Sequence, residues 1–142
     1  MDQAERLQRL EKLMEELQQE NLTVPVLVEG KRDVEALRNI GLEGEILMVH
    51  EGHTIIEMCE ALASRHKEVI LMLDWDRKGR QLTERIRRIL MTEDIKVNEE
   101  FMGRIFFLVC KETKEVEALD GLMVRLRKLG ERKKLPLRPL RD

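Results

Sequence analysis

The chain contains few aromatic residues and few cysteines. Its 142 residues include no tyrosine, one tryptophan, three phenylalanines and two cysteines. Binding of single-stranded nucleic acid by base stacking uses exposed aromatic rings, so this composition argues against such a platform. Cys59 and Cys110 each lie in a stretch of apolar periodicity, which predicts buried, reduced thiols rather than a disulfide. Two cysteines and three histidines without close spacing also disfavour a structural zinc site.

Several local signals are missing as well. No stretch approaches the roughly 18 uncharged apolar residues of a membrane span, and residues 1–10 lack the basic and then apolar order of a secretory signal. We therefore expect a cytoplasmic protein that does not enter membranes. The sequence has neither a Walker motif nor G-x-G-x-x-G, and its single serine, Ser64, falls in a helical pattern. Nucleotide-binding loops of these two types and a serine nucleophile are poorly supported.

The bulk composition fits a soluble globular protein of one domain, with 42% hydrophobic and 38% charged residues. The net charge of −2 is spread unevenly: residues 125–142 carry +6 and the remainder carries −8. A basic tail on an acidic body can contact phosphates, or it can be a solvated end. The sequence leaves both readings open.

Short apolar runs alternate with amphipathic stretches over the middle of the chain. The runs predict buried strands at 23–29, 45–49 and 68–73, with a short fourth strand at 95–97. The amphipathic stretches predict helices at 33–42, 53–67 and 77–90. This alternation predicts an α/β fold, a Rossmann-like parallel sheet of about four strands flanked by helices.

Extra helices are expected at both ends of this unit. A leucine-rich stripe at 3–20 indicates a helix that packs on its own domain, and it leaves a homodimer contact open. We expect helices at 101–109, where a strand is the alternative, and at 115–129, with a frayed end at 135–142. The organisation is then an N-terminal amphipathic helix (1–22), a core (23–98) and a C-terminal helical extension with a basic tail (99–142).

Charged residues gather where the predicted strands end. Glu29 follows the first strand, and Asp74 and Asp76 follow the third. Ligands of open parallel sheets bind beyond the carboxyl ends of the strands, so these carboxylates are candidate site residues. Three unpaired carboxylates in a small volume repel one another, and a hard cation such as Mg²⁺ would relieve that repulsion. The alternative is a set of helix caps and surface charges.

Cations near the same strand ends suit phosphate groups. The candidates are Lys31, Arg32, Arg77, Lys78 and Arg80. His50 and His53 flank the second strand-to-helix turn. They are either surface or capping residues, or they contact a phosphate or assist proton transfer. Trp75 lies between the two aspartates, and strand alternation predicts that it packs inward.

The segments "VLVEGKRD" and "ILMLDWDRKGRQL", about forty residues apart, resemble the two motifs of the Toprim domain. Topoisomerases of types IA and II, bacterial primases, certain nucleases and a ribosomal RNA maturase share this domain. The chain is most similar to small stand-alone archaeal and bacterial Toprim proteins. The resemblance covers roughly residues 23–98 and implies a Toprim fold.

The resemblance also implies roles for individual residues. Glu29 matches the family glutamate, a general acid/base or metal ligand, and Asp74 and Asp76 match the Asp-x-Asp pair that coordinates Mg²⁺. Lys31 and Asp33 match the form of the first motif found in primases. The absence of tyrosine excludes tyrosyl strand passage by this chain, and the additional domains of primases are missing.

These patterns predict a Mg²⁺-dependent protein, with Mn²⁺ as a substitute, that acts on phosphodiester bonds of RNA or DNA, most simply as a nuclease. Glu29 and Lys31 are the candidate catalytic residues, and Glu29, Asp74 and Asp76 are the candidate metal ligands. Asp33, His50 and His53 are additional candidates. Two alternatives stay open: a non-catalytic module that binds nucleic acid or a partner, and a phosphotransferase with Asp74 as nucleophile.

Overall fold

The computed structural model describes residues 1–134, with side chains through residue 131, and shows an α/β fold. Its sheet has four parallel strands in the order β2-β1-β3-β4. The elements in chain order are α1 (Gln3–Asn21), β1 (Val26–Val28), α2 (Lys31–Ile40), β2 (Ile46–Met48), α3 (Ile55–Arg65), β3 (Glu68–Leu71), α4 (Arg77–Leu90), β4 (Lys96–Asn98), α5 (Glu100–Val109), the 3₁₀ helix η1 (Val116–Ala118) and α6 (Leu119–Lys134). The predicted fold class is confirmed, and so is each predicted strand.

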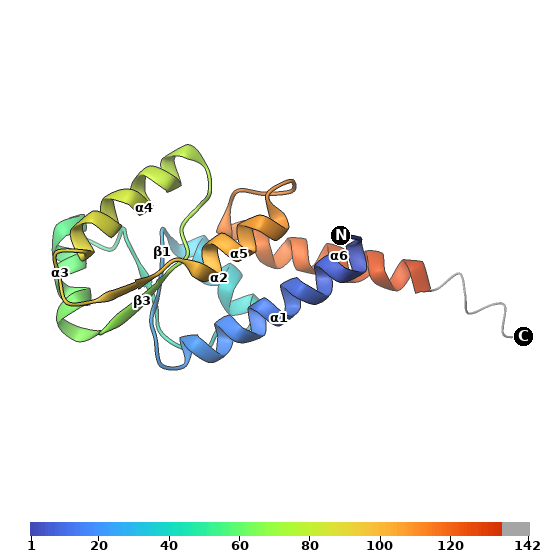
Figure 1. Cartoon of the computed structure of the whole chain (residues 1–142), viewed down its shortest axis with the longest axis horizontal. Coiled ribbons are helices and arrows are strands. Elements are labelled where there is room, and N and C mark those ends of the chain that lie inside the picture. The colour runs from blue at the N-terminus through green and yellow to red at the C-terminus, as the bar shows by residue number, and fades with distance from the viewer. Residues whose placement is uncertain (135–142) are drawn as a thin grey trace, which may run out of the picture.

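The helices form two layers around the sheet (Figure 1). Helices α3 and α4 pack against each other, whereas α1 packs on α5 and α6, and α2 packs on α6 and η1. Right-handed crossovers explain this division, since β1–α2–β2 advances in one direction across the sheet and the next two crossovers advance in the other. The central strands are therefore covered on both faces.

The strand sequences match this burial. All of β1 is buried, as are three of the four residues of β3, and both strands are apolar at consecutive positions. Strand β2 forms an edge and is only half-buried. Gly41 ends α2 with φ of 119°, the left-handed conformation that favours glycine at this position.

The N-terminal helix belongs to the same core. Leu10, Met14 and Leu17 on α1 are buried against the rest of the chain, as its apolar stripe predicted. Buried Asn21, at the end of α1, joins two loops: its amide donates to the carbonyl oxygens of Val24 and Glu45, and its oxygen accepts from the Gly44 N–H at 2.8 Å. These bonds fix α1 to the amino-terminal side of the sheet.

The region after β4 settles the open alternative in favour of a helix. Residues 100–109 form α5, which buries Phe101, Ile105 and Val109. Cys59 is buried as predicted, but the prediction for Cys110 was wrong. Cys110 follows the last turn of α5, where the apolar periodicity ends, and its side chain is exposed. The predicted end at 135–142 lies outside the described residues.

Trp75 packs inward, as predicted. Its side chain is 7% exposed, its indole N–H donates to the Met102 carbonyl at 3.0 Å, and its ring stacks on Phe106 with centroids 5.9 Å apart. The indole is therefore part of the contact between α5 and the end of β3. Within residues 1–134, no helix has the length and apolar character needed to cross a membrane.

Candidate functional site at the carboxyl end of the sheet

The acidic residues of both motifs lie at the carboxyl ends of neighbouring strands. Glu29 directly follows β1, and Asp74 follows β3, which pairs with β1 in parallel. Asp76 is the N-cap of α4. Because parallel strands end at the same edge of a sheet, two motifs that are far apart in sequence meet at one rim.

Asp74 is half-buried, as are Glu29 and Asp76. Its Oδ1 accepts a hydrogen bond from the backbone N–H of Val116 at 2.9 Å. Burial raises the pKa of Asp74 to about 6, and the negative charges of Asp33, Glu29 and Asp76 add to this effect. Asp74 therefore stands close enough to three other carboxylates for their charges to disfavour its ionisation.

Asp76 shapes the turn into α4. Its Oδ1 accepts from the Gly79 N–H at 2.7 Å, a side-chain cap at the first turn of the helix. Gly79 lies directly against the preceding strand end, and a Cβ atom at this position would stand 2.2 Å from the backbone oxygen of Asp74. The glycine of this motif thus allows the helix to start beside Asp74.

Asp33 belongs to the same acidic cluster, from the first turn of α2. It is buried, and its Oδ2 accepts from the Gly30 N–H at 3.0 Å. Burial raises the pKa of Asp33; the hydrogen bond from Gly30 opposes this, and the charges of Glu117 and Glu29 add to it. Asp33 was a secondary candidate from the sequence, and the structure places it next to Glu29 and Asp74.

The sequence did not predict the contribution of the segment 114–117. Besides the bond from Val116 to Asp74, the Lys114 carbonyl accepts from the Trp75 N–H at 2.7 Å, so this segment runs alongside the Asp-x-Asp motif. In Figure 1 it belongs to the chain between α5 and α6, next to the start of α4. It also brings Glu115 and Glu117 to the rim. The hydrogen bond and the charge of Glu117 raise the pKa of Glu115, and the charges of Asp76 and Asp33 add to this effect.

The donor chemistry of the rim suits a hard cation, since every candidate ligand is a carboxylate oxygen. Asp74 and Asp76 each use Oδ1 for a backbone N–H, which leaves the second oxygen of each for another partner. Across residues 1–134, however, no group of three or more His, Cys, Asp or Glu side chains is arranged as a ready-made metal site. The carboxylates are neighbours, but they do not form a ligand set in this arrangement.

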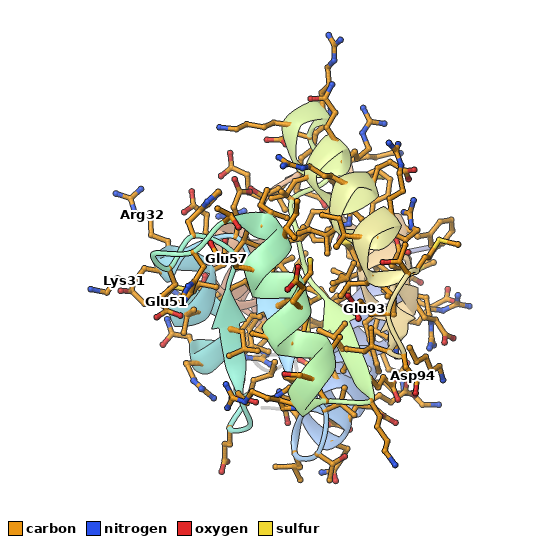
Figure 2. All side chains as sticks on the ribbon, turned by 90° about the vertical axis from the view of Figure 1, so that its left-hand side faces the viewer. Lys31, Arg32, Glu51, Glu57, Glu93 and Asp94 are labelled. Atoms are coloured by element: carbon orange, nitrogen blue, oxygen red, sulfur yellow. The ribbon has the colours of Figure 1, made fainter. Side chains whose placement is uncertain are left out.

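The predicted phosphate-binding residues surround this rim on exposed surfaces. Lys31 and Arg32 extend outward from the first turn of α2, on the same side of the molecule as Glu51 and Glu57 (Figure 2). Arg77, Lys78 and Arg80 are exposed at the start of α4. His50 and His53 are exposed in the loop between β2 and α3.

The raised pKa of Asp74 predicts how the metal-free protein responds to pH. Below its usual pKa of 3.8, the carboxyl is protonated in both the folded and unfolded states; between about 4 and 6 only the folded state keeps the proton. Ionisation then costs the folded state about 1 to 3 kcal/mol, so this contribution to stability is lost as pH rises through 6. The Asp74→Asn variant lacks this loss and keeps an oxygen for the Val116 N–H.

Urea unfolding in EDTA from pH 4 to 7.5 measures this effect. We expect the two proteins to be similarly stable near pH 4, and the variant to become more stable than the wild type as pH rises. A stability difference that is constant over this range would show that Asp74 does not titrate with a raised pKa.

Comparisons with known proteins found a matching family model, similar proteins and a solved structure with a similar fold. The family model described as the Toprim domain matches residues 24–109. A UPF0292 protein of Methanocaldococcus jannaschii is 35% identical over 119 residues, 84% of this chain and 93% of that protein. A UPF0292 protein of Thermococcus kodakarensis is 36% identical over 101 residues, 71% of this chain and 74% of that protein. A solved structure of an Aquifex aeolicus protein, 24% identical, covers 75% of this chain and 94% of its own with a TM-score of 0.64, which shows a shared fold.

Proposed function

Because this chain belongs to the Toprim domain family, whose members are associated with nucleic acids, we propose that it is a Mg²⁺-dependent nuclease that cleaves phosphodiester bonds of RNA or DNA. The observation that carries the proposal is the acidic cluster at the rim. Asp74 lies beside Glu29, Asp33 and Asp76; burial raises its pKa, and the negative charges of these three carboxylates raise it further. A cation at this place would relieve the repulsion among the four carboxylates.

Asp74 and Asp76 would hold the ion through the carboxylate oxygens that do not cap a backbone N–H. Glu29, half-buried directly after β1, would complete the ligand set or move a proton at an oxygen of the phosphate. A bound Mg²⁺ or Mn²⁺ supplies Lewis acidity, which polarises a phosphate and stabilises the negative charge that develops on it.

The cations around the rim would position the substrate. Lys31 and Arg32 on α2, and Arg77, Lys78 and Arg80 on α4, lie on exposed surfaces on either side of the carboxylates. Their long side chains can neutralise phosphates that flank the bond to be cleaved, and arginine can do so in bidentate fashion. Lys31 is close in sequence to Glu29 and is the candidate to contact the phosphate that reacts.

The second candidate function is a non-catalytic nucleic-acid-binding module. One observation favours it: within the described residues, the carboxylates are not arranged as a ready-made metal site. A nuclease of this design needs its half-buried carboxylates to rotate toward the ion on binding. A non-catalytic module would need only the exposed lysine and arginine side chains, which bind phosphates.

Cleavage of labelled single-stranded and duplex RNA and DNA, with Mg²⁺, Mn²⁺ or EDTA, tests the proposal. We expect products only with the metal ions, and a loss of roughly 100-fold or more in Glu29→Gln because a ligand or proton-transfer group is removed. Glu35→Gln, an exposed position on the same α2 helix as Lys31, is the matched control and should cleave normally. Binding without cleavage under every condition would establish the module instead.

A further inference from the structure

Helix α4 carries a row of arginines on one exposed face. Arg77, Arg80, Arg85 and Arg88 are exposed and, with Gln81 and Glu84, line a shallow groove of about 550 Å³. These positions recur every three to five residues, which places them on one side of the helix. The row extends over the twelve residues from Arg77 to Arg88, and the eleven steps between its ends correspond to about 16 Å at the rise of an α-helix. We call Arg77, Arg80, Arg85 and Arg88 the arginine row.

Ion pairing separates this row from the structural arginine of the helix. Arg87 pairs with Glu99 through two hydrogen bonds of 2.6 Å and also contacts Glu84, so it ties α4 to the segment after β4. In contrast, Arg77, Arg80 and Arg85 form no salt bridge with any side chain that the structure describes. Arg88 meets Glu84 at 3.3 Å while its side chain stays 76% exposed. Most of the positive charge of the row is therefore available to a ligand.

The position of the row links it to the acidic rim. Helix α4 begins at Asp76, and the row leads away from this residue along the outer surface of the α3–α4 layer. Beyond the far end of α4 stand two acidic residues, Glu93 and Asp94 (Figure 2). The positive surface thus starts at the candidate cleavage site and ends about 16 Å away.

A ligand for this surface must present several negative charges over that length. The groove contains no aromatic side chain on which a base could stack, and proteins that hold single strands commonly combine cations with such rings. The phosphodiester backbone of a double helix presents one phosphate per about 3.4 Å of axis on each strand, so 16 Å covers about five nucleotides of one strand. Both the length and the absence of stacking surfaces fit a duplex.

We propose that the arginine row binds the phosphate backbone of double-helical nucleic acid and holds it across the acidic rim. This proposal rests on the proposed function for the position of the scissile bond, but it concerns binding and can be tested without cleavage. Arg85 and Arg88 are the informative residues, because they lie far along α4 from Asp76 and are no part of the candidate catalytic group.

The experiment measures binding of the full chain to a 20-base-pair RNA duplex, a DNA duplex of the same sequence and the corresponding single strands, by fluorescence anisotropy in EDTA at several salt concentrations. For Arg85→Gln/Arg88→Gln we expect duplex affinity to fall by roughly tenfold or more near 0.1 M salt, and the slope of log K against log salt to decrease by about 1.8, since two phosphate contacts are lost. Glu84→Gln removes the acid of the groove and should bind the duplex more tightly than the wild type.

The matched control is Arg65→Gln/Lys67→Gln, which removes the same charge from exposed positions at the end of α3 and just before β3. Its duplex affinity should equal that of the wild type within twofold. An effect on the RNA duplex, the DNA duplex or both supports the proposal and identifies the substrate. Equal losses in the two double variants, or single strands bound as tightly as duplexes, would overturn it.

The outcomes for the row and for catalysis are separable. If the wild type shows no cleavage and the arginine-row variant loses duplex binding, the proposal that the row binds a duplex is supported. The nuclease proposal then fails. If cleavage occurs and the arginine-row variant cleaves and binds duplex as the wild type does, the nuclease proposal stands. The proposal that the arginine row binds a duplex is then refuted.

Discussion

Asp74→Asn is expected to reduce Mg²⁺-dependent cleavage by roughly a thousandfold or more while leaving the fold intact. The loss follows from the chemistry: a neutral amide binds a hard cation far more weakly than a carboxylate does, and the several kcal/mol that a metal ion contributes to charge stabilisation correspond to about three powers of ten in rate. The substitution is nearly isosteric. Its remaining oxygen can still accept from the Val116 N–H, which contacts Oδ1 in the wild type.

Single-turnover cleavage at saturating Mg²⁺, together with urea unfolding, measures both consequences. Asp94→Asn is a suitable control, because Asp94 is an exposed aspartate beyond the end of α4, away from the rim. This control should cleave at the wild-type rate. The Asp74 variant should also lose the stabilisation against unfolding that added Mg²⁺ gives to the wild type, because ion binding favours the folded state. Cleavage retained within tenfold would refute the assignment of Asp74 to the metal.

The fold could be predicted from the sequence because its elements are strongly patterned. The consecutive apolar positions of β1 and β3 indicate strands covered on both faces, and the stripes of α1 and α4 indicate helices that bury one side. The prediction for Cys110 failed for a different reason: α5 ends at Val109, as the sequence predicted, and Cys110 is its C-cap, so this residue lies outside the apolar periodicity that buries one side of the helix.

The rim could be predicted for a different reason. In a parallel sheet, the residue after each strand lies at the same edge, so Glu29 and the Asp-x-Asp pair could be placed together without coordinates. Whether these side chains hold a metal ion remains a prediction. The bond from Val116 to Asp74 could not be foreseen, because it joins residues 42 positions apart through the packing of η1 on α2. Local patterning carries no information on such a contact.

This long-range contact gives the C-terminal helices a role at the rim. Because Lys114 and Val116 bond to Trp75 and Asp74, the orientation of the Asp-x-Asp motif depends on a segment that lies beyond the 24–109 match to the family model. The same segment packs on α2, whose first turn carries Asp33. Both halves of the acidic cluster are thus held by one chain segment, and displacement of that segment would separate them.

Gly79→Ala is the glycine substitution at the rim with the largest expected effect. A Cβ atom at this position would stand 2.2 Å from the Asp74 oxygen and 2.7 Å from its carbonyl carbon, both of which belong to the backbone and cannot turn aside. The start of α4 and the end of β3 must therefore move apart. We expect a loss of about 2 to 3 kcal/mol in the free energy of unfolding, the upper range for an overpacked site. We also expect cleavage to fall by roughly 100-fold, because displacements of about 1 Å at catalytic groups have this cost.

Gly103→Ala separates this steric effect from the general effect of replacing a helical glycine. Gly103 lies within α5, is exposed, and has no neighbour within 4 Å of the added Cβ. There the alanine should raise the free energy of unfolding by up to about 1 kcal/mol, since it favours the helix and meets nothing. The two substitutions are chemically identical and should change stability in opposite directions. Similar urea midpoints for both would mean that the turn beside Asp74 has room for a side chain, and that the glycine of this motif serves some purpose other than close packing.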